Sequence, residues 1–266
     1  MRQRIGIDAG GSLVKICYEQ NNQLHYRKHH YHEMEDVLKW LNLVTPNANY
    51  KLTGGKAGIL QEKYFANVSV VPEFQATCEG AIFLTKAASL SLERYLLVNV
   101  GTGTSWYIIN GDQHKRIFGS GVGGGTFLGL GSILAGETAF SSFVDLSNSG
   151  NREKVDLLVK DIYGPNKPPI NGDLTASNFA KGRTDQSHKS DDLASLTNMI
   201  SETIVLLTSQ LAINNEVDIV IFIGSTVSGH PKLKESLHFY TNMLGLKSFN
   251  LDHGEYSGAV GALLTI

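Results

Sequence analysis

The first residues of the chain alternate between apolar and polar positions on both sides of a short glycine turn. Residues 4–8 and the start of residues 13–19 follow the period of two that is typical of β-strands. The four residues between them, Ala9-Gly10-Gly11-Ser12, are turn formers. Two strands joined by so tight a turn predict a β-hairpin.

The same three-part pattern returns about ninety residues further along the chain. Residues 95–100 are an apolar strand pattern, residues 101–104 read Gly-Thr-Gly-Thr, and residues 105–109 are a return strand. That strand ends at Asn110-Gly111, which is a strong hairpin signal. Because strand, glycine turn and strand occur twice in the same order, we interpret the pattern as an internal duplication.

Helices and short strands alternate over the rest of the chain. Apolar residues at helical spacing predict helices over residues 33–43, 76–88, 127–140, 151–163, 191–214, 231–244 and 256–264. Short apolar runs predict strands over residues 24–30, 50–53, 68–71 and 217–223. No low-complexity linker interrupts this order. We therefore place the domain boundary at a short crossover between Ser89 and Arg94, which divides the chain into residues 1–92 and 93–266.

Composition narrows the class of protein. With 266 residues, 42% of them hydrophobic and 18% charged, the chain is not intrinsically disordered. A net charge of −2 argues against a nucleic-acid binder. The longest apolar run, Ile219–Ile223, is too short to span a membrane, and no signal peptide is expected. Cys17 and Cys78 fit reduced thiols. We expect a cytoplasmic protein that binds neither nucleic acid nor membrane.

Glycine is frequent and unevenly distributed. Of the 28 glycines, 11 fall between Gly101 and Gly136. Three turns that contain glycine follow apolar strands, at residues 8–12, 101–105 and 223–226. Such turns expose backbone N–H groups with no Cβ in the way, which is the general form of a phosphate cradle. One turn of this kind is more often an ordinary hairpin, but three after strands favour a nucleotide site.

Charged residues flank the first glycine turn. Asp8 ends the strand before the turn, and a carboxylate beside phosphates is a place for Mg²⁺, usually through water. Lys15 lies on the return strand, where its ammonium can reach a phosphate. The sequence therefore predicts Mg²⁺ near Asp8.

Two other motifs do not indicate a functional site of the kind they suggest. The histidines at positions 25, 29, 30 and 32 have no cysteine or acidic motif at ligand spacing, so we expect no metal site there. Lys56 follows Gly54-Gly55, but the spacing of a P-loop is missing and Ala57 stands where Ser or Thr is needed.

The combined motifs resemble the superfamily of actin, sugar kinases and heat-shock chaperones. Within it the chain most resembles the type II pantothenate kinases, in particular the compact staphylococcal members. The matching segments run in order along almost the whole chain: Gly6–Lys15, Leu52–Gly55, Glu73–Ala76, Asn99–Ser105, Arg116, Gly119–Phe127, Pro169–Phe179 and Tyr256–Ala262. The resemblance implies an α/β fold of two duplicated, ribonuclease-H-like domains with an ATP cleft between them.

The resemblance also implies roles for particular residues. Glu73 matches the catalytic base, Arg116 matches a catalytic and substrate-binding residue, and Ser105 matches a second pantothenate contact. Residues 123–128 match a segment that opens a helix, where N–H groups favour a phosphate. The ATP-binding residues implied are Asp8, Ala9, Gly10, Gly11, Ser12, Leu13, Val14, Lys15, Thr102, Gly123, Gly124, Gly125, Thr126, Phe127, Leu128, Phe140, Gly224 and Ser225.

The chemistry implied is phosphoryl transfer. Glu73 takes the proton of the substrate hydroxyl while Mg²⁺ near Asp8 bridges the phosphates of ATP. Without the resemblance Glu73 is an undistinguished surface acid, and Glu79 is a rival base. Ser12 replaces the threonine of many relatives and keeps the hydroxyl. Gln75 stands where some relatives have aspartate.

We therefore expect ATP-dependent phosphorylation of pantothenate to 4'-phosphopantothenate, the first step of coenzyme A biosynthesis. An amino-sugar kinase of the N-acetylglucosamine type is the nearest alternative, and a non-kinase actin-like ATPase or binding module is another. Because the family is dimeric, we expect a homodimer. The helix around Leu193–Leu211 is a candidate interface, although its apolar stripe could equally belong to the core.

Overall fold

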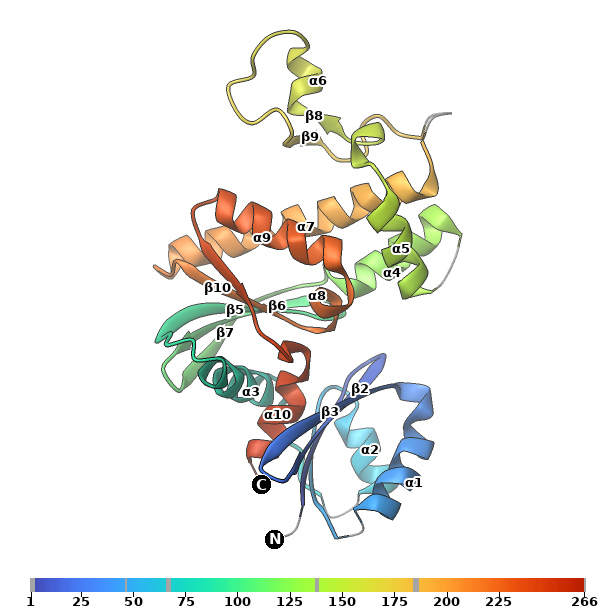
Figure 1. Ribbon diagram of the computed structural model, residues 1–266, viewed down its shortest axis with the longest axis vertical. Coiled ribbons are helices and arrows are strands. Elements are labelled where there is room, and N and C mark those ends of the chain that lie inside the picture. Colours follow the sequence, from blue (N-terminus) through green and yellow to red (C-terminus); the bar gives the residue numbers. More distant parts are fainter. Residues whose placement is uncertain (1–2, 46, 66–67, 137–138, 184–186, 266) are drawn as a thin grey trace.

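Two mixed sheets organise the computed structural model, which describes residues 3–45, 47–65, 68–136, 139–183 and 187–265 (Figure 1). The first sheet has the strand order β3-β2-β1-β4. Its strands are β1 (Arg4–Ala9), β2 (Leu13–Gln20), β3 (Gln23–His30) and β4 (Asn49–Thr53). β1 pairs antiparallel with β2 and parallel with β4. The predicted hairpin around the first glycine turn is therefore confirmed.

The second sheet repeats this topology and has the order β11-β10-β5-β6-β7. Its strands are β5 (Arg94–Val100), β6 (Thr104–Asn110), β7 (Gln113–Ser120), β10 (Ile219–Ile223) and β11 (Lys247–Asn250). β5, β6 and β7 form an antiparallel meander, and β10 lies parallel to β5 as β4 lies parallel to β1. The shared order confirms the predicted duplication. β7 and β11 were not among the predicted strands.

Two helices from distant parts of the chain, α3 (Glu73–Ala87) and α10 (Ser257–Leu264), lie between the two sheets (Figure 1). A Cβ at Gly80 of α3 would lie 1.9 Å from a backbone oxygen of α10, and one at Gly261 of α10 would lie 1.8 Å from a backbone oxygen of α3. Only glycine permits this approach. α10 also packs against β1 of the first sheet, although the predicted boundary at residue 92 assigns it to the second domain. That boundary stays a prediction.

The outer face of each sheet carries its own helices. α1 (Met34–Val44) and α2 (Ala57–Tyr64) pack on the first sheet through a cluster that includes Met34, Leu41 and Leu60. Besides α10 and one short helix described below, the second half contains α4 (Gly124–Ala135), α5 (Phe140–Ser149), α7 (Lys189–Asn214), α8 (Ser225–Gly229) and α9 (Pro231–Met243). α2 was not predicted.

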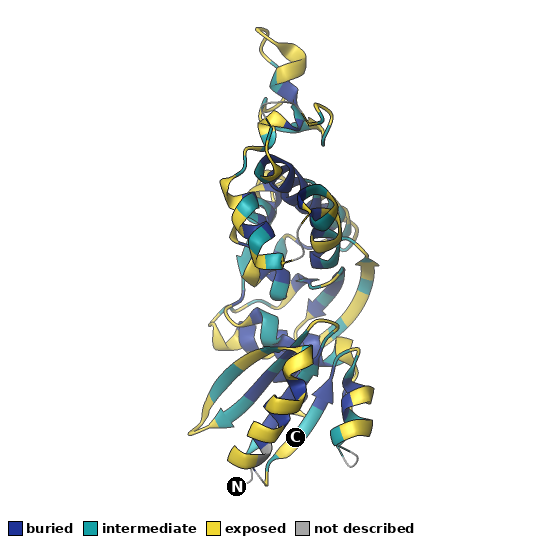
Figure 2. Ribbon diagram, turned by 90° about the vertical axis from the view of Figure 1, so that its right-hand side faces the viewer, coloured by how far each residue is buried: buried dark blue, intermediate teal, exposed yellow. Residues whose placement is uncertain are grey.

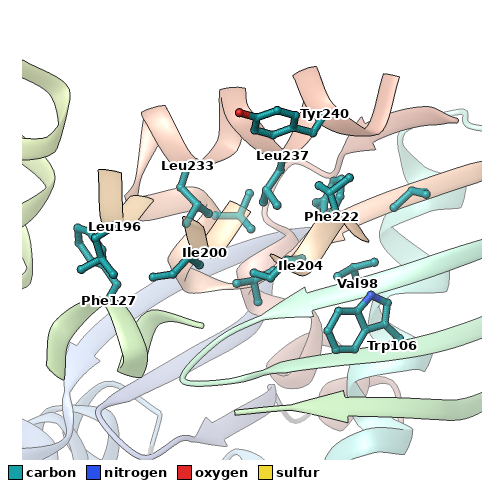
Figure 3. Close-up of a cluster of buried hydrophobic side chains, with 14 of the residues drawn as sticks. Val98, Trp106, Phe127, Leu196, Ile200, Ile204, Phe222, Leu233, Leu237 and Tyr240 are labelled. Atoms are coloured by element: carbon teal, nitrogen blue, oxygen red, sulfur yellow. The ribbon is translucent and has the colours of Figure 1, made fainter. Parts of the chain in front are cut away.

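The largest core lies between the second sheet and α7 (Figure 3). Leu196, Ile200 and Ile204 of α7 are fully buried there, and the Trp106 indole donates a hydrogen bond of 2.8 Å to Thr208 Oγ1. The apolar stripe of α7 is therefore core, which was one of its two expected roles, and an interface on another face of α7 stays a prediction. α7 is long and apolar enough to cross a membrane, but most of its apolar window is buried, as in a core helix.

The helix predicted over residues 151–163 is wrong, because an arm projects from the helical layer there (Figures 1 and 2). The arm contains the 3₁₀ turn Arg152–Lys154, β8 (Leu157–Leu158), α6 (Val159–Tyr163) and β9 (Thr175–Ser177). The Asn151 side chain accepts a hydrogen bond from the N–H of Glu153, and the Asp161 carboxylate accepts one from the N–H of Leu158. Such side-chain bonds compete with a continuous helix.

Two further predictions need correction. The helix predicted over residues 127–140 is two helices, because α4 ends at Gly136, whose φ of 72° is the left-handed conformation of a C-terminal cap. Residues 137–138 lie outside the described part of the chain. The strand predicted over residues 68–71 is an isolated bridge between Val70 and Leu52.

Candidate active site

A cleft of about 500 Å³ is lined by both halves of the duplicated chain. The first half contributes Asp8, Gly10, Gly11, Ser12, Leu13, Lys15, Glu73, Phe74 and Thr77. The second half contributes Asn99, Gly101, Thr102, Gly103, Thr104, Ser105, Tyr107, Arg116, Gly119, Ser120, Gly121 and Ser225. The two predicted glycine turns therefore border the same cavity.

Asp8 and Lys15 form the charged pair beside the first turn. They are register partners on β1 and β2, and the Lys15 Nζ lies 3.8 Å from Asp8 Oδ2. Burial raises the pKa of the Asp8 carboxyl, and the Lys15 ammonium opposes that rise. Glycines make room on both sides, since a Cβ at Gly54 would lie 2.5 Å from Asp8 Oδ1 and one at Gly258 would lie 2.7 Å from Oδ2.

Glu73 is the first residue of α3, directly after Pro72. Its side chain is exposed to the cleft, yet the surrounding protein removes enough water to raise the pKa of the carboxyl, and the charge of Asp8 raises it further. Lys15 acts in the opposite direction. The rival base, Glu79, does not line the cleft and instead accepts a hydrogen bond of 2.8 Å from Gln75.

Arg116 reaches the cleft because of an irregularity between β6 and β7. Tyr107 pairs with Arg116 but Trp106 pairs with Phe118, so one extra residue in β7 forms a bulge. The bulge leaves Phe118 against Trp106 on the core side and Arg116 on the cleft side. There the guanidinium carbon lies 4.7 Å from the centroid of the Phe74 ring.

Tyr107 is a second cleft residue on the same strand as Ser105. Burial raises the pKa of its hydroxyl to about 12, although the hydrogen bond with Ser105 and the nearby Arg116 oppose this rise. The Tyr107 hydroxyl is therefore protonated at neutral pH and can act as a hydrogen-bond donor. Its ring centroid lies 6.0 Å from that of Phe74.

The two halves of the cleft are built alike but charged differently. Asn99 is the penultimate residue of β5, as Asp8 is of β1, and its register partner is Ser105 rather than a lysine. Gly224 follows β10 with φ +109°, and a Cβ there would lie 2.7 Å from Asn99 Oδ1. Gly54, which follows β4 with φ +94°, has the same relation to Asp8. The charged pair is thus confined to the first copy.

The segment predicted to offer N–H groups to a phosphate differs from expectation. The N–H groups of Gly124 and Gly125 donate to the carbonyl oxygens of Gly101 and Thr102, both at 2.8 Å. These two N–H groups therefore hold the second turn rather than point into the cleft. Phe127 is buried in the core. A nucleotide contact by residues 123–128 stays a prediction, but it does not use these donors.

Eleven of the predicted site residues line the cleft, and the others do not. Those that do are Asp8, Gly10, Gly11, Ser12, Leu13, Lys15, Glu73, Thr102, Ser105, Arg116 and Ser225. Those that do not are Ala9, Val14, Gly123, Gly124, Gly125, Thr126, Phe127, Leu128, Phe140 and Gly224. Their roles stay predictions.

Seven cleft residues received no site role from the sequence: Phe74, Thr77, Asn99, Tyr107, Gly119, Ser120 and Gly121. Two had a usable signal, because Thr77 is one helical turn after Glu73 and Tyr107 is two residues after Ser105 on the same strand face. Among the described residues, no group of three or more His, Cys, Asp or Glu side chains is arranged to hold a metal.

Comparison with known proteins decides the family. The family model named Fumble matches residues 19–265. Type II pantothenate kinases from Oceanobacillus iheyensis and Staphylococcus saprophyticus are 39% and 38% identical to this chain, and the alignments cover 99% and 98% of it and 99% of each relative. The chain belongs to the type II pantothenate kinase family. The resemblance drawn from the sequence motifs is confirmed.

Solved structures show the same fold at low identity. The activator of the 2-hydroxyisocaproyl-CoA dehydratase from Clostridium difficile, with bound ADPNP, is 14% identical with a TM-score of 0.66, over 99% of this chain and 93% of that one. A ROK family glucokinase from Streptomyces griseus, in complex with glucose and AMPPNP, is 12% identical with a TM-score of 0.60, over 99% and 98%. These likenesses establish the duplicated, actin-like fold expected for the kinase family.

Proposed function

We propose that this protein transfers the γ-phosphoryl group of ATP to the primary hydroxyl of pantothenate. The product is 4'-phosphopantothenate, and the reaction is the first step of coenzyme A biosynthesis. The observation that carries the proposal is the meeting of two glycine turns, the Asp8–Lys15 pair, Glu73 and Arg116 in one cleft. The relatives that share the whole length of the chain are named for this activity.

The residues present fit Mg-ATP. Lys15 and the N–H groups of the two turns suit phosphate oxygens, and Ser225, which the resemblance implies as an ATP-binding residue, also lines the cleft. Asp8 supplies one carboxylate, which suits Mg²⁺ because that ion keeps several waters and shares phosphate oxygens. When bound, Mg²⁺ supplies positive charge that stabilises the transferring phosphoryl group. Asp8 must be ionised for this role; burial raises the pKa of its carboxyl, and the Lys15 ammonium opposes that rise.

Glu73 has the environment of a general base. Its pKa is raised toward neutral pH, and a general base is most effective when its pKa lies close to the pH of the reaction. In the proposed step the pantothenate oxygen forms a bond to the γ-phosphorus, the bond from that phosphorus to the β–γ bridging oxygen breaks, and Glu73 receives the hydroxyl proton. ADP leaves with the bridging oxygen.

Arg116 and its neighbours form the proposed acceptor side of the cleft. The guanidinium lies against Phe74, with Tyr107 and Ser105 on the adjacent strand. A fixed cation there suits the carboxylate of pantothenate or the negative oxygens of the transferring group. The hydroxyls of Ser105 and Tyr107 suit the polar groups of pantothenate that lie between its carboxylate and its reacting hydroxyl.

The decisive assay is ADP production with pantothenate, N-acetylglucosamine or no acceptor, with the phosphorylated product identified by mass spectrometry. We expect turnover with pantothenate alone. Turnover with the amino sugar alone would instead make the protein an amino-sugar kinase, and acceptor-independent hydrolysis would favour a non-kinase ATPase. Glu73→Gln is expected to lower turnover at least about 100-fold while the ATP dissociation constant stays within about twofold. Glu79→Gln is the matched control and retains activity.

We further propose a cytoplasmic homodimer with no nucleic-acid or membrane partner. Support for a second copy comes from large apolar side chains exposed on α7 and α9, namely Leu206, Ile213, Phe239 and Met243. Light scattering should give twice the chain mass of 29.0 kDa. A monomer at micromolar concentration would contradict the proposed dimer without affecting the proposed reaction.

A further inference from the structure

The loop that follows β4 holds the first glycine turn through Lys56. Its Nζ donates a hydrogen bond of 2.5 Å to the carbonyl oxygen of Gly11, and its backbone N–H donates one of 3.0 Å to the carbonyl oxygen of Ala9. The same ammonium lies 3.7 Å from the centroid of the Tyr31 ring. Tyr31 in turn donates its backbone N–H to the carbonyl oxygen of Ser12 at 3.0 Å. Lys56 and Tyr31 together fix the directions of three carbonyl groups around the turn, those of Ala9, Gly11 and Ser12.

These contacts determine where the free N–H groups of the turn point. In a planar trans peptide the C=O and the following N–H point in opposite directions. A bond from Lys56 to the Gly11 carbonyl therefore directs the Ser12 N–H away from Lys56. Gly11 and Ser12 both line the cleft, and the backbone hydrogen bonds of the described residues include none from either N–H group. Their donors are left for a ligand.

The second copy of the fold uses the same position for the same task. Lys56 is two residues after Gly54, and Thr226 is two residues after Gly224, the other positive-φ glycine beside a turn. The Thr226 hydroxyl donates a hydrogen bond of 2.9 Å to the carbonyl oxygen of Gly101, which belongs to the second turn. Two independent copies thus tether a turn carbonyl by the side chain at this position. The first copy uses a cation, which reaches further and binds a carbonyl more strongly than a neutral donor.

We propose that Lys56 is a positioning residue for ATP, which orients the Ser12 N–H toward the phosphates by holding the Gly11 carbonyl. The inference rests on the proposed function, since it concerns the nucleotide side of that cleft. Lys56 itself is not among the residues that line the cleft, so it acts through the turn. Its loss therefore weakens ATP binding without changing the acceptor side.

The test compares Lys56→Met with Lys56→Arg, which keeps a cationic donor. Lys63→Met is the matched control, because Lys63 also lies over a tyrosine ring, at 5.0 Å from the Tyr64 centroid, and does not contact the turn. Loss of one charge-assisted hydrogen bond predicts a rise of about tenfold in the KM for ATP with Lys56→Met. We expect an unchanged KM for pantothenate, recovery to within about threefold with Lys56→Arg, and wild-type values with Lys63→Met.

Calorimetric titration with AMPPNP separates this inference from the proposed reaction. If the wild-type protein does not phosphorylate pantothenate, a tenfold weaker AMPPNP affinity of Lys56→Met still supports the role of Lys56. An unchanged affinity, or an equal loss in the KM values of both substrates, would overturn it. If Lys56→Met has a low melting temperature, Tyr31→Leu is measured in its place. That substitution removes the ring beneath the ammonium and should raise the KM for ATP about two- to threefold.

Discussion

Gly119→Ala should impair the enzyme through Arg116 while leaving the fold intact. A Cβ at position 119 would lie 2.0 Å from Arg116 Nη2 and 3.1 Å from its Cζ. Contacts closer than 3.4 Å are tight, so the nitrogen has to move by about 1.4 Å to reach that distance. Because the obstructing atom is the end of a flexible side chain, the guanidinium moves rather than the backbone.

The expected magnitude follows from that displacement. The stacking of Arg116 on Phe74 at 4.7 Å contributes about 0.5–1 kcal/mol at an exposed site. Its loss in Gly119→Ala should lower the free energy of unfolding by no more than that amount. A catalytic group misplaced by about 1 Å costs on the order of 100-fold in rate. That factor corresponds to about 3 kcal/mol of transition-state stabilisation. We therefore expect kcat/KM to fall about 100-fold while the free energy of unfolding falls by less than about 1 kcal/mol.

Steady-state kinetics and urea unfolding of the same preparation test this reasoning. Gly58→Ala is the control, because a Cβ at that helical position meets no atom within 4 Å, and it should retain wild-type kinetics. Arg116→Ala should show a loss at least as large as that of Gly119→Ala. The reasoning is refuted if Gly119→Ala keeps wild-type kcat/KM, or if its kinetic loss follows a comparable loss of stability.

Three further predictions concern helix packing and pH. Gly261→Ala should destabilise the protein by about 3 kcal/mol in urea unfolding, because its Cβ would lie 1.8 Å from a backbone oxygen of Ala76; a change below about 1 kcal/mol would contradict the close helix contact. The pKa of Glu73 is raised above its ordinary 4.5, so kcat/KM should rise with pH along a limb centred above 4.5; a midpoint at or below 4.5 would remove Glu73 as the base. Burial lowers the pKa of His230 to about 4, so the histidine of the unfolded chain takes up a proton at a higher pH than that of the folded protein. The free energy of unfolding should therefore be highest above pH 6.5 and fall by up to about 3 kcal/mol as the pH is lowered to 4. His230→Gln should flatten that loss, measured by melting at each pH.

The parts of the fold that sequence predicts are those with a strong local pattern. The alternating strands and glycine turns at both hairpins are found where expected, and so is the long apolar helix α7. β7 was missed because its bulge breaks the alternation on which strand prediction depends. The arm was missed because side-chain bonds from Asn151 and Asp161 replace a helix that apolar spacing alone allows.

The site was predictable only where a motif carried chemistry. Asp8 and Lys15 are charged residues beside a glycine turn, and their pairing follows from the hairpin register. Phe74 has no chemical signature, and its contact with Arg116 depends on a bulge in a strand more than 40 residues away. The donors of Gly124 and Gly125 illustrate the opposite error, because a helix start that looks open in sequence is already capped by the second turn.

The duplicated frame explains why the chemistry belongs to one copy of the hairpin. Both copies place a polar residue near a strand end, a partner on the return strand and a positive-φ glycine that leaves room beside it. In the first copy the pair is Asp8 and Lys15, and in the second it is Asn99 and Ser105. A second carboxylate in place of Asn99 would add negative charge to the cleft that the proposed function assigns to ATP, and like charges in a cleft repel each other. A neutral second copy therefore suits the proposed binding of a triphosphate in this cleft.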